Sequence, residues 1–209
     1  MDGLLIDSEP LWQEAGSSVL LQYGITLSEA EYHSTTGLRT PEWLDHWFTH
    51  FQVDQQHASS ASSIVEQSAH DFILEKGIAM PGVQYIMDFF KEQGFRIGLA
   101  SSSPMHLIKM VIDKLKIGPY LSAVTSAEKL PFGKPHPQVF LDCAELLQVR
   151  PTTCIVFEDS FNGLIAAKSA RMKCVVVPAP ELQHQSRWDA ADLKLSSLEQ
   201  FDQATLLSL

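Results

Sequence analysis

The run Cys154-Ile155-Val156-Phe157-Glu158-Asp159-Ser160 decides the fold, because it joins a short apolar strand to two adjacent carboxylates and then to a helix. Comparable apolar runs lie at 96–100, 123–125 and 173–177, and the intervening segments have helical spacing at 105–116, 137–147 and 162–170. Apolar strands that alternate with helices are typical of a parallel sheet covered on both faces. We therefore predict a doubly wound, Rossmann-like α/β domain.

The segment from residue 9 to residue 76 has a different pattern, with helical periodicity and no convincing strand. Its apolar residues recur at helical spacing in three groups: Leu11, Ala15, Val19, Leu20; Trp43, Trp47, Phe48, Phe51; Ile64, Phe72, Ile73. Thr40-Pro41-Glu42 is typical of an N-cap followed by proline in the first helical turn. We predict a helical cap at 9–77, inserted into an α/β core made of residues 1–8 and 78–209.

The length, hydrophobic content and net charge of the chain exclude several classes of function. The chain has 209 residues, of which 45% are hydrophobic, so it is long enough for a substantial core. A formal net charge of −10 argues against nucleic acid or an anionic membrane as a partner. No apolar run approaches the length of a membrane span, and the acidic start does not resemble a signal peptide. We expect a cytoplasmic monomer that acts on a small molecule.

The three cysteines are Cys143, Cys154 and Cys174. Their surroundings are apolar and their spacing is not that of a metal site or of a disulfide framework. We expect reduced thiols.

Two segments suit phosphate chemistry, although each also has a simpler structural interpretation. Ala100-Ser101-Ser102-Ser103-Pro104 ends a strand and begins a helix, where hydroxyls and free backbone N–H groups either bind phosphate or cap the helix. Gly133-Lys134-Pro135-His136-Pro137 holds a lysine between glycine and proline before a helix. This lysine could neutralise an aspartyl-phosphate or could be a solvated loop residue.

Two further segments place carboxylates at strand ends. Glu158 and Asp159 follow an apolar strand, where adjacent carboxylates are costly unless a cation lies between them. Open α/β sheets bind their ligands at such strand ends. The N-terminal run Met1-Asp2-Gly3-Leu4-Leu5-Ile6-Asp7-Ser8-Glu9 contains Asp-Gly, which on its own is a common turn signal.

Together, these four segments resemble the haloacid-dehalogenase-like hydrolases, in order and spacing, from residue 1 to about residue 180. The resemblance is closer to the beta-phosphoglucomutase-like sugar-phosphatase branch, which includes the 2-deoxyglucose-6-phosphate and hexitol phosphatases. It is clearest in three runs: Gly3–Trp12, Ser126–Pro131 and Lys134–Val139. It implies a phosphatase that uses Mg²⁺ to hydrolyse small sugar or sugar-alcohol phosphate monoesters through an aspartyl-phosphate.

The resemblance also implies roles for catalytic residues. Asp2 would be the general acid/base, and its backbone carbonyl would touch Mg²⁺. Ser101 would bind the transferred phosphoryl group with help from Ser102. Lys134 would pair with the nucleophile and the phosphate.

The resemblance implies two metal ligands and one cap residue. Asp159 would ligate Mg²⁺ directly, and Glu158 would do so directly or through water. Arg39, in the loop Thr36-Gly37-Leu38-Arg39, matches a substrate contact made from the cap, whereas its plainer interpretation is a surface arginine. Sugar phosphomutases of this branch carry a histidine where Trp12 stands, which favours hydrolysis over the alternative of intramolecular phosphoryl transfer.

The start of the chain departs from the family pattern. Met1-Asp2 matches the second half of Asp-x-Asp-Gly, so the attacking Asp would lie just upstream of Met1, at the end of a strand between 96–100 and 154–157. Either Met1 lies within a longer reading frame, or the chain is a truncated, inactive relative that acts as a binding or regulatory module. In both cases, the two runs would lack a shared neighbour, and we expect residues 1–209 alone to be inactive.

Overall fold

The computed structural model describes residues 1–209 and confirms the alternation of strands and helices after residue 77. The elements of this part are α5 (Val83–Glu92), β1 (Ile97–Ser101), α6 (Met105–Leu115), β2 (Leu121–Ser126), α7 (Gln138–Leu146), β3 (Ile155–Glu158), α8 (Phe161–Ser169), β4 (Lys173–Val176), β5 (Leu193–Lys194) and α9 (Gln203–Ser208). All strand pairs are parallel. Helices α5, α6 and α7 pack on β1 and β2, whereas α8 packs on β3 and β4. The predicted α/β fold is confirmed.

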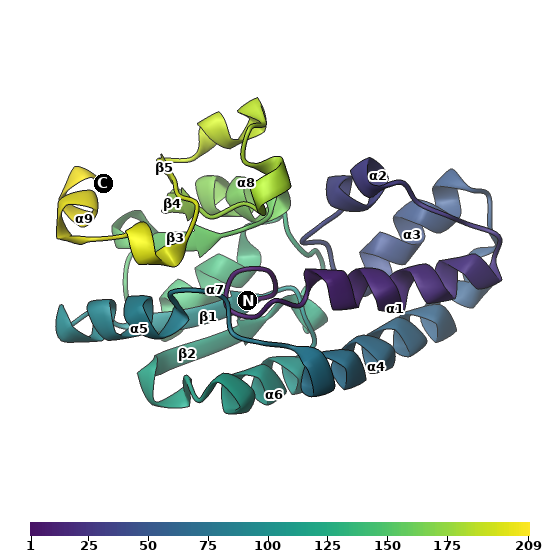
Figure 1. The fold of residues 1–209 in the computed structure, drawn as a ribbon, viewed down its shortest axis with the longest axis horizontal. Coiled ribbons are helices and arrows are strands. Elements are labelled where there is room, and N and C mark those ends of the chain that lie inside the picture. Colours follow the sequence, from purple (N-terminus) through teal and green to yellow (C-terminus); the bar gives the residue numbers. More distant parts are fainter.

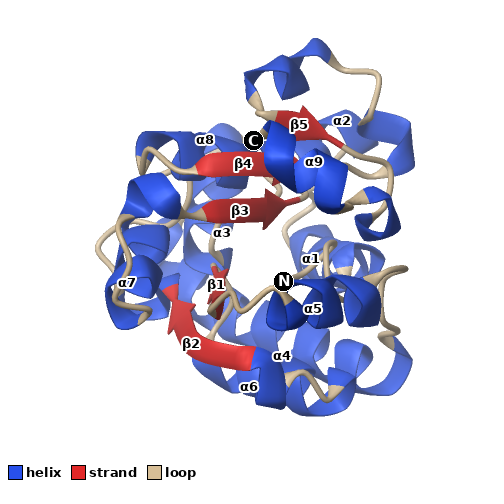
Figure 2. Ribbon diagram, turned by 90° about the vertical axis from the view of Figure 1, so that its left-hand side faces the viewer, coloured by secondary structure: helices blue, strands red, loops and turns tan.

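The strands form two sheets, as Figure 2 shows: β1 pairs with β2, and β3–β4–β5 form the second sheet. The inner strands β1 and β3 do not pair with each other, so the prediction that they lack a shared neighbour is confirmed. A cavity of about 410 Å³ lies between them. Its walls are mostly apolar and include both inner strands and the side chains of Leu4, Leu5, Met87, Phe90, Phe140 and Leu147.

Four helices occupy the segment 9–76, namely α1 (Glu9–Gln22), α2 (Glu29–Ser34), α3 (Thr40–His50) and α4 (Ala58–Lys76). Helices α1 and α3 both pack on α4, and Figure 1 shows α1, α2 and α3 to one side of the sheets. Gly16 allows the close packing of α1, because a Cβ there would lie 2.8 Å from Cη2 of Trp43. None of the nine α-helices in the chain is long and apolar enough to cross a membrane.

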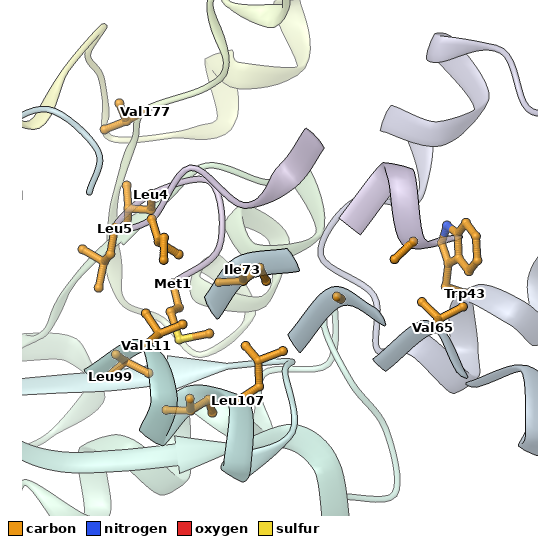
Figure 3. Close-up of a cluster of buried hydrophobic side chains, with 14 of the residues drawn as sticks. Met1, Leu4, Leu5, Trp43, Val65, Ile73, Leu99, Leu107, Val111 and Val177 are labelled. Atoms are coloured by element: carbon orange, nitrogen blue, oxygen red, sulfur yellow. The ribbon is translucent and has the colours of Figure 1, made fainter. Parts of the chain in front are cut away.

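The apolar spacing found in the sequence predicted half of the buried residues of these helices, with most of the misses in α4. Trp43, Trp47 and Phe48 are buried, whereas Ile64 is 48% exposed and Phe51 is 38% exposed. The N-cap of α3 is Arg39 and not Thr40, which is the first helical residue. One hydrophobic cluster extends from the helical segment into the α/β core (Figure 3). The division into a core at 1–8 and 78–209 and a cap at 9–77 stays a prediction.

The two chain segments that enter and leave the helical part lie side by side. Ile6 and Ala79 form an antiparallel bridge, the N–H of Asp7 donates to the carbonyl of Ile78 at 2.9 Å, and the N–H of Met80 donates to the carbonyl of Leu5 at 3.0 Å. The chain therefore enters and leaves the helical part through two adjacent segments that are hydrogen-bonded to each other.

The three cysteines are free, as predicted. Cys143 and Cys174 are buried, and burial raises the pKa of Cys143 to about 11 and that of Cys174 still further. These thiols therefore stay protonated and act as small apolar side chains.

The packing of Phe201 generates a prediction about stability. This fully buried ring lies 5.0 Å from the ring centroid of Phe157 and 5.4 Å from that of Phe90, so it joins the C-terminal segment to β3 and α5. We expect Phe201→Ala to lower the free energy of unfolding by about 3–5 kcal/mol. Leu207→Ala, at a side chain that is 78% exposed, should change it by less than about 0.5 kcal/mol. Urea denaturation of both variants measures the difference, and equal effects would contradict the packing described.

Candidate active site

A polar pocket of about 100 Å³ lies between the α/β core and the helical segment. The structure brings all four sequence segments to its wall, through Met1, Asp2, Ser101, Ser102, Lys134, Glu158 and Asp159. Helical-segment residues complete the wall, among them Trp12, Thr36, Leu38 and Trp43. Ser101, at the carboxyl end of β1, and Glu158, at the carboxyl end of β3, both line it, and open α/β sheets bind their ligands at such ends.

Asp2 is held by three hydrogen bonds from side chains. Oδ1 accepts from Ser8 Oγ at 2.8 Å and from Trp12 Nε1 at 3.0 Å, and Oδ2 accepts from Ser103 Oγ at 2.7 Å. The donors come from the N-terminal segment, from α1 and from the loop after β1. Both oxygens of the Asp2 carboxylate are therefore fixed in place before any ligand arrives.

The three serines after β1 have different partners. The Oγ of Ser101 accepts from the N–H of Ser103 at 3.1 Å, and Ser101 itself is buried at the pocket wall. Ser102 donates to the carbonyl of Gly37 at 2.8 Å, so its hydroxyl holds the helical segment. Ser103, which we did not single out from the sequence, holds Asp2 instead. In the sequence, the signal for this role of Ser103 was its position two residues after Ser101.

Lys134 and Glu158 form a buried ion pair, and the side chain of each is only 5% exposed. Burial opposes the charge of Glu158, but the charges of Lys134 and of the Met1 amino group, together with hydrogen bonds from Lys134 and Ser160, lower the pKa of that carboxyl. The other Glu158 oxygen accepts from the N–H and the Oγ of Ser160, at 3.3 and 3.1 Å. The Lys134 ammonium also lies 4.7 Å from the ring centroid of Phe140. Lys134 is therefore a fixed cation at the pocket wall.

Gly163 explains how Glu158 fits beside helix α8. A Cβ at this position would overlap the Glu158 carboxylate. Ser160 is the N-cap of α8, and its Oγ accepts from the N–H of Gly163 at 3.0 Å. The helix therefore begins directly against the carboxylate, where its N-terminal dipole favours negative charge.

Asp159 has no hydrogen bond from another side chain, in contrast to Asp2 and Glu158. Burial and the neighbouring charge of Glu158 raise its pKa to about 7. Glu9 lines the same pocket, and burial together with the charges of Asp159 and Asp2 raises its pKa well above the usual value. Glu9 was not singled out from the sequence, although it closes the Asp7-Ser8-Glu9 motif. The site therefore gathers the carboxyl groups of Asp2, Glu9, Glu158 and Asp159 around two positive groups, the Lys134 ammonium and the α-amino group of Met1.

This set of donors fits a hard divalent cation, because carboxylate and carbonyl oxygens are the ligands that Mg²⁺ prefers. No group of three or more His, Cys, Asp or Glu side chains is arranged to hold a metal ion. The carboxylates of Asp2 and Glu158 already accept hydrogen bonds, whereas those of Asp159 and Glu9 accept none from another side chain. Of these two, Asp159 at the end of β3 would ligate the cation directly. Asp2 would then contribute its backbone carbonyl, and Glu158 a contact through water.

The loop 35–38 covers the pocket and is tied to the core at two points. The carbonyl of Thr36 accepts from Asn162 Nδ2 at 2.8 Å, and the carbonyl of Gly37 accepts from Ser102. Gly37 has a φ of +90°, and a Cβ there would lie 2.6 Å from the Oγ of Ser160. Only glycine lets this loop approach the core so closely.

Arg39 lies away from the place that the resemblance implied. It is not among the residues that line the pocket, and its guanidinium donates to the carbonyls of Ala127, Leu130 and Pro131 and to Glu42. The expected contact with substrate stays a prediction, and in this arrangement the terminal nitrogens of Arg39 donate to the core.

The model of the haloacid dehalogenase-like hydrolases matches residues 1–177. The chain belongs to this family. It is similar to hexitol phosphatase B of Escherichia coli K12, with 44% identity over 211 residues that cover 99% of this chain and 94% of that protein. It is also 30% identical to the phosphorylated carbohydrates phosphatase of Thermotoga maritima, over 81% of this chain and 78% of that protein.

Among solved structures, beta-phosphoglucomutase from Clostridium difficile has the same fold. It matches with a TM-score of 0.86 over 99% of this chain and 92% of that chain, at 24% sequence identity. The predicted family and fold class are thereby confirmed.

The contact between Gly163 and Glu158 can be tested by adding one methyl group. Gly163→Ala should displace the Glu158 carboxylate or the start of α8, and we expect it to lower the free energy of unfolding by about 1–3 kcal/mol. Gly118→Ala is the control, because a Cβ there meets only Cγ2 of Ile112, at 3.5 Å. Chemical denaturation measures both. A Gly163→Ala protein as stable as the control would show that the site tolerates the added methyl.

Proposed function

We propose that the protein is a Mg²⁺-dependent phosphatase that hydrolyses phosphate monoesters of small sugars or sugar alcohols. The observation that carries the proposal is the convergence of Asp2, Ser101, Lys134 and Asp159 on one pocket beneath the helical segment. The substrate class is supported by the sequence similarity of the chain to hexitol phosphatase B and to the phosphorylated carbohydrates phosphatase.

The charges of the site explain what each residue contributes. A phosphate dianion repels an attacking carboxylate, so positive charge must offset this repulsion before attack. Lys134 supplies a fixed ammonium, and Ser101 supplies a buried hydroxyl that can donate to a phosphoryl oxygen. Mg²⁺, held by Asp159, would supply further positive charge at the phosphoryl group.

Asp2 is suited to move the proton. A carboxylate has about four acceptor sites, and three of them are used by Ser8, Trp12 and Ser103, so that one remains for a proton. In the proposed reaction, Asp2 protonates the leaving sugar oxygen and then takes a proton from the water that hydrolyses the aspartyl-phosphate. The indole of Trp12, which stands where mutases of this branch have histidine, is engaged with Asp2, which favours hydrolysis over the mutase alternative.

The nucleophile is proposed to be an Asp directly before Met1, at the end of a strand that lies between β1 and β3. Met1 and Glu158 line both the polar pocket and the apolar cavity between the sheets. A residue joined to the nitrogen of Met1 would therefore stand where the two cavities meet. The facing edges of β1 and β3 offer unpaired backbone groups to such a strand.

The metal assignment predicts a change in stability as well as in activity. At about 100 times its Kd, Mg²⁺ should raise the thermal midpoint by about 5–10 °C, because it binds only the folded site. Asp159→Asn should remove this shift and abolish hydrolysis of p-nitrophenyl phosphate by the strand-extended protein. Without Mg²⁺ this variant should be at least as stable as the wild type, since it removes one of the repelling carboxylates. Full activity in excess EDTA would refute the metal assignment.

The proposed nucleophile predicts a comparison of two chain lengths. The first is residues 1–209, and the second is extended upstream in frame by an apolar strand that ends in Asp. The short form should hydrolyse sugar phosphates slower by about 10³-fold or more, because Asp2 cannot attack phosphorus in its place. It should also be less soluble, with two inner strands unpaired. Activity of the short form within about tenfold of the long form would show that another carboxylate attacks. An inactive long form would instead favour a binding or regulatory module.

A further inference from the structure

Arg39 and Glu42, at the start of α3, hold one loop of the core. Arg39 Nη1 donates to the carbonyls of Ala127 and Leu130 at 3.0 and 2.6 Å, and Nη2 donates to the carbonyl of Pro131 at 3.2 Å. Nη2 also donates to Glu42 Oε1 at 2.7 Å. The same Glu42 oxygen accepts from the N–H of Gly133 at 2.8 Å.

This contact is built into the interior and is not a loose surface pair. The Arg39 side chain is 13% exposed and the Glu42 side chain 29%. Gly133 is buried beneath them, since a Cβ there would overlap Glu42 and lie 2.9 Å from Cγ of Arg39. Burial opposes the charge of Glu42, but the hydrogen bonds from Arg39 and from the Gly133 amide lower the pKa of this carboxyl.

The loop that is held leads directly into the site. Gly133 precedes Lys134, whose ammonium lies at the pocket wall. The two ties of the covering loop end elsewhere, at Asn162 in α8 and at Ser102 in the loop after β1. Among these ties, only the Arg39–Glu42 pair joins the helical segment to the backbone beside Lys134.

We propose that Arg39 and Glu42 form a latch that closes the helical segment on the core and positions Lys134 for phosphoryl transfer. The role of Lys134 in this inference rests on the proposed function. When the helical segment moves away, the carbonyls of Leu130 and Pro131 and the amide of Gly133 lose these partners together, and the carbonyl of Ala127 keeps only the N–H of Leu130. The backbone before Lys134 is then held only while the pocket is covered. Arg39 and Glu42 are thus positioning residues, and neither touches the substrate.

The latch can be tested without turnover, by amide hydrogen exchange of residues 1–209 followed by NMR. Arg39→Gln and Glu42→Gln should each raise the exchange rate of the Gly133 amide by about tenfold. The double variant should show no more than the larger single effect, because the two residues act as one unit. Glu14→Gln is the matched control, since it breaks an ion pair with Lys76 that lies wholly within the helical segment. Unchanged exchange at Gly133 in both single variants would overturn the latch.

Kinetics of the strand-extended protein separate the latch from a substrate contact. Misplacing Lys134 should lower kcat by about tenfold to a hundredfold in Arg39→Gln, for a sugar phosphate and for p-nitrophenyl phosphate alike. A contact with the sugar would instead raise KM for the sugar phosphate only, and that result would overturn the proposal. If wild type and variants all lack activity while Gly133 exchange changes as expected, the proposed function fails and the latch stands as a closing contact.

Discussion

The structure depends on two positive groups, the Lys134 ammonium and the α-amino group of Met1, that must serve several carboxylates. Lys134 pairs with Glu158, while Asp2, Glu9 and Asp159 surround the same pocket. Carboxylates that share one small buried pocket repel each other strongly, because little water screens their charges. The fold meets this constraint with three neutral donors on Asp2 and with a helix that begins against Glu158. Asp159 has neither kind of support, and the repulsion from Glu158 together with burial raises its pKa.

Glu158 and Asp159 lie at the carboxyl end of β3, and Asp2 accepts a hydrogen bond from Ser103 just after β1. The chemistry of the site therefore depends on how the two sheets are held together. The polar pocket and the apolar cavity share Met1 and Glu158. A strand that filled the apolar cavity would add backbone hydrogen bonds to both sheets and would place its last residue beside Lys134. Stability and catalysis would then be supplied by the same few residues, which is why the two chain lengths should differ in both.

Sequence reasoning could predict the strands, the family and the meeting of the four segments, because each depends on local patterns of apolar and polar residues. The apolar run at 154–157 identified β3 to within one residue. The two-residue strand β5 could not be found, since Leu193–Lys194 has no apolar periodicity and pairs only because β4 lies beside it. Ser103 and Glu9 were overlooked because their partners come from other elements.

The role of Arg39 as a substrate contact stays a prediction, and its surroundings show what would compete with a substrate. The resemblance placed an arginine at the correct point of the covering loop, but its hydrogen bonds depend on carbonyls about ninety residues away along the chain. A guanidinium has five donors in a planar fork, so it can bind several carbonyls as well as it binds a phosphate. The position of the helical segment decides which of the two Arg39 binds. When this segment lies closed on the core, the carbonyls of the core loop are within reach of the guanidinium and accept its hydrogen bonds. A substrate that competed for Arg39 would have to open this contact, and would thereby release the backbone that holds Lys134.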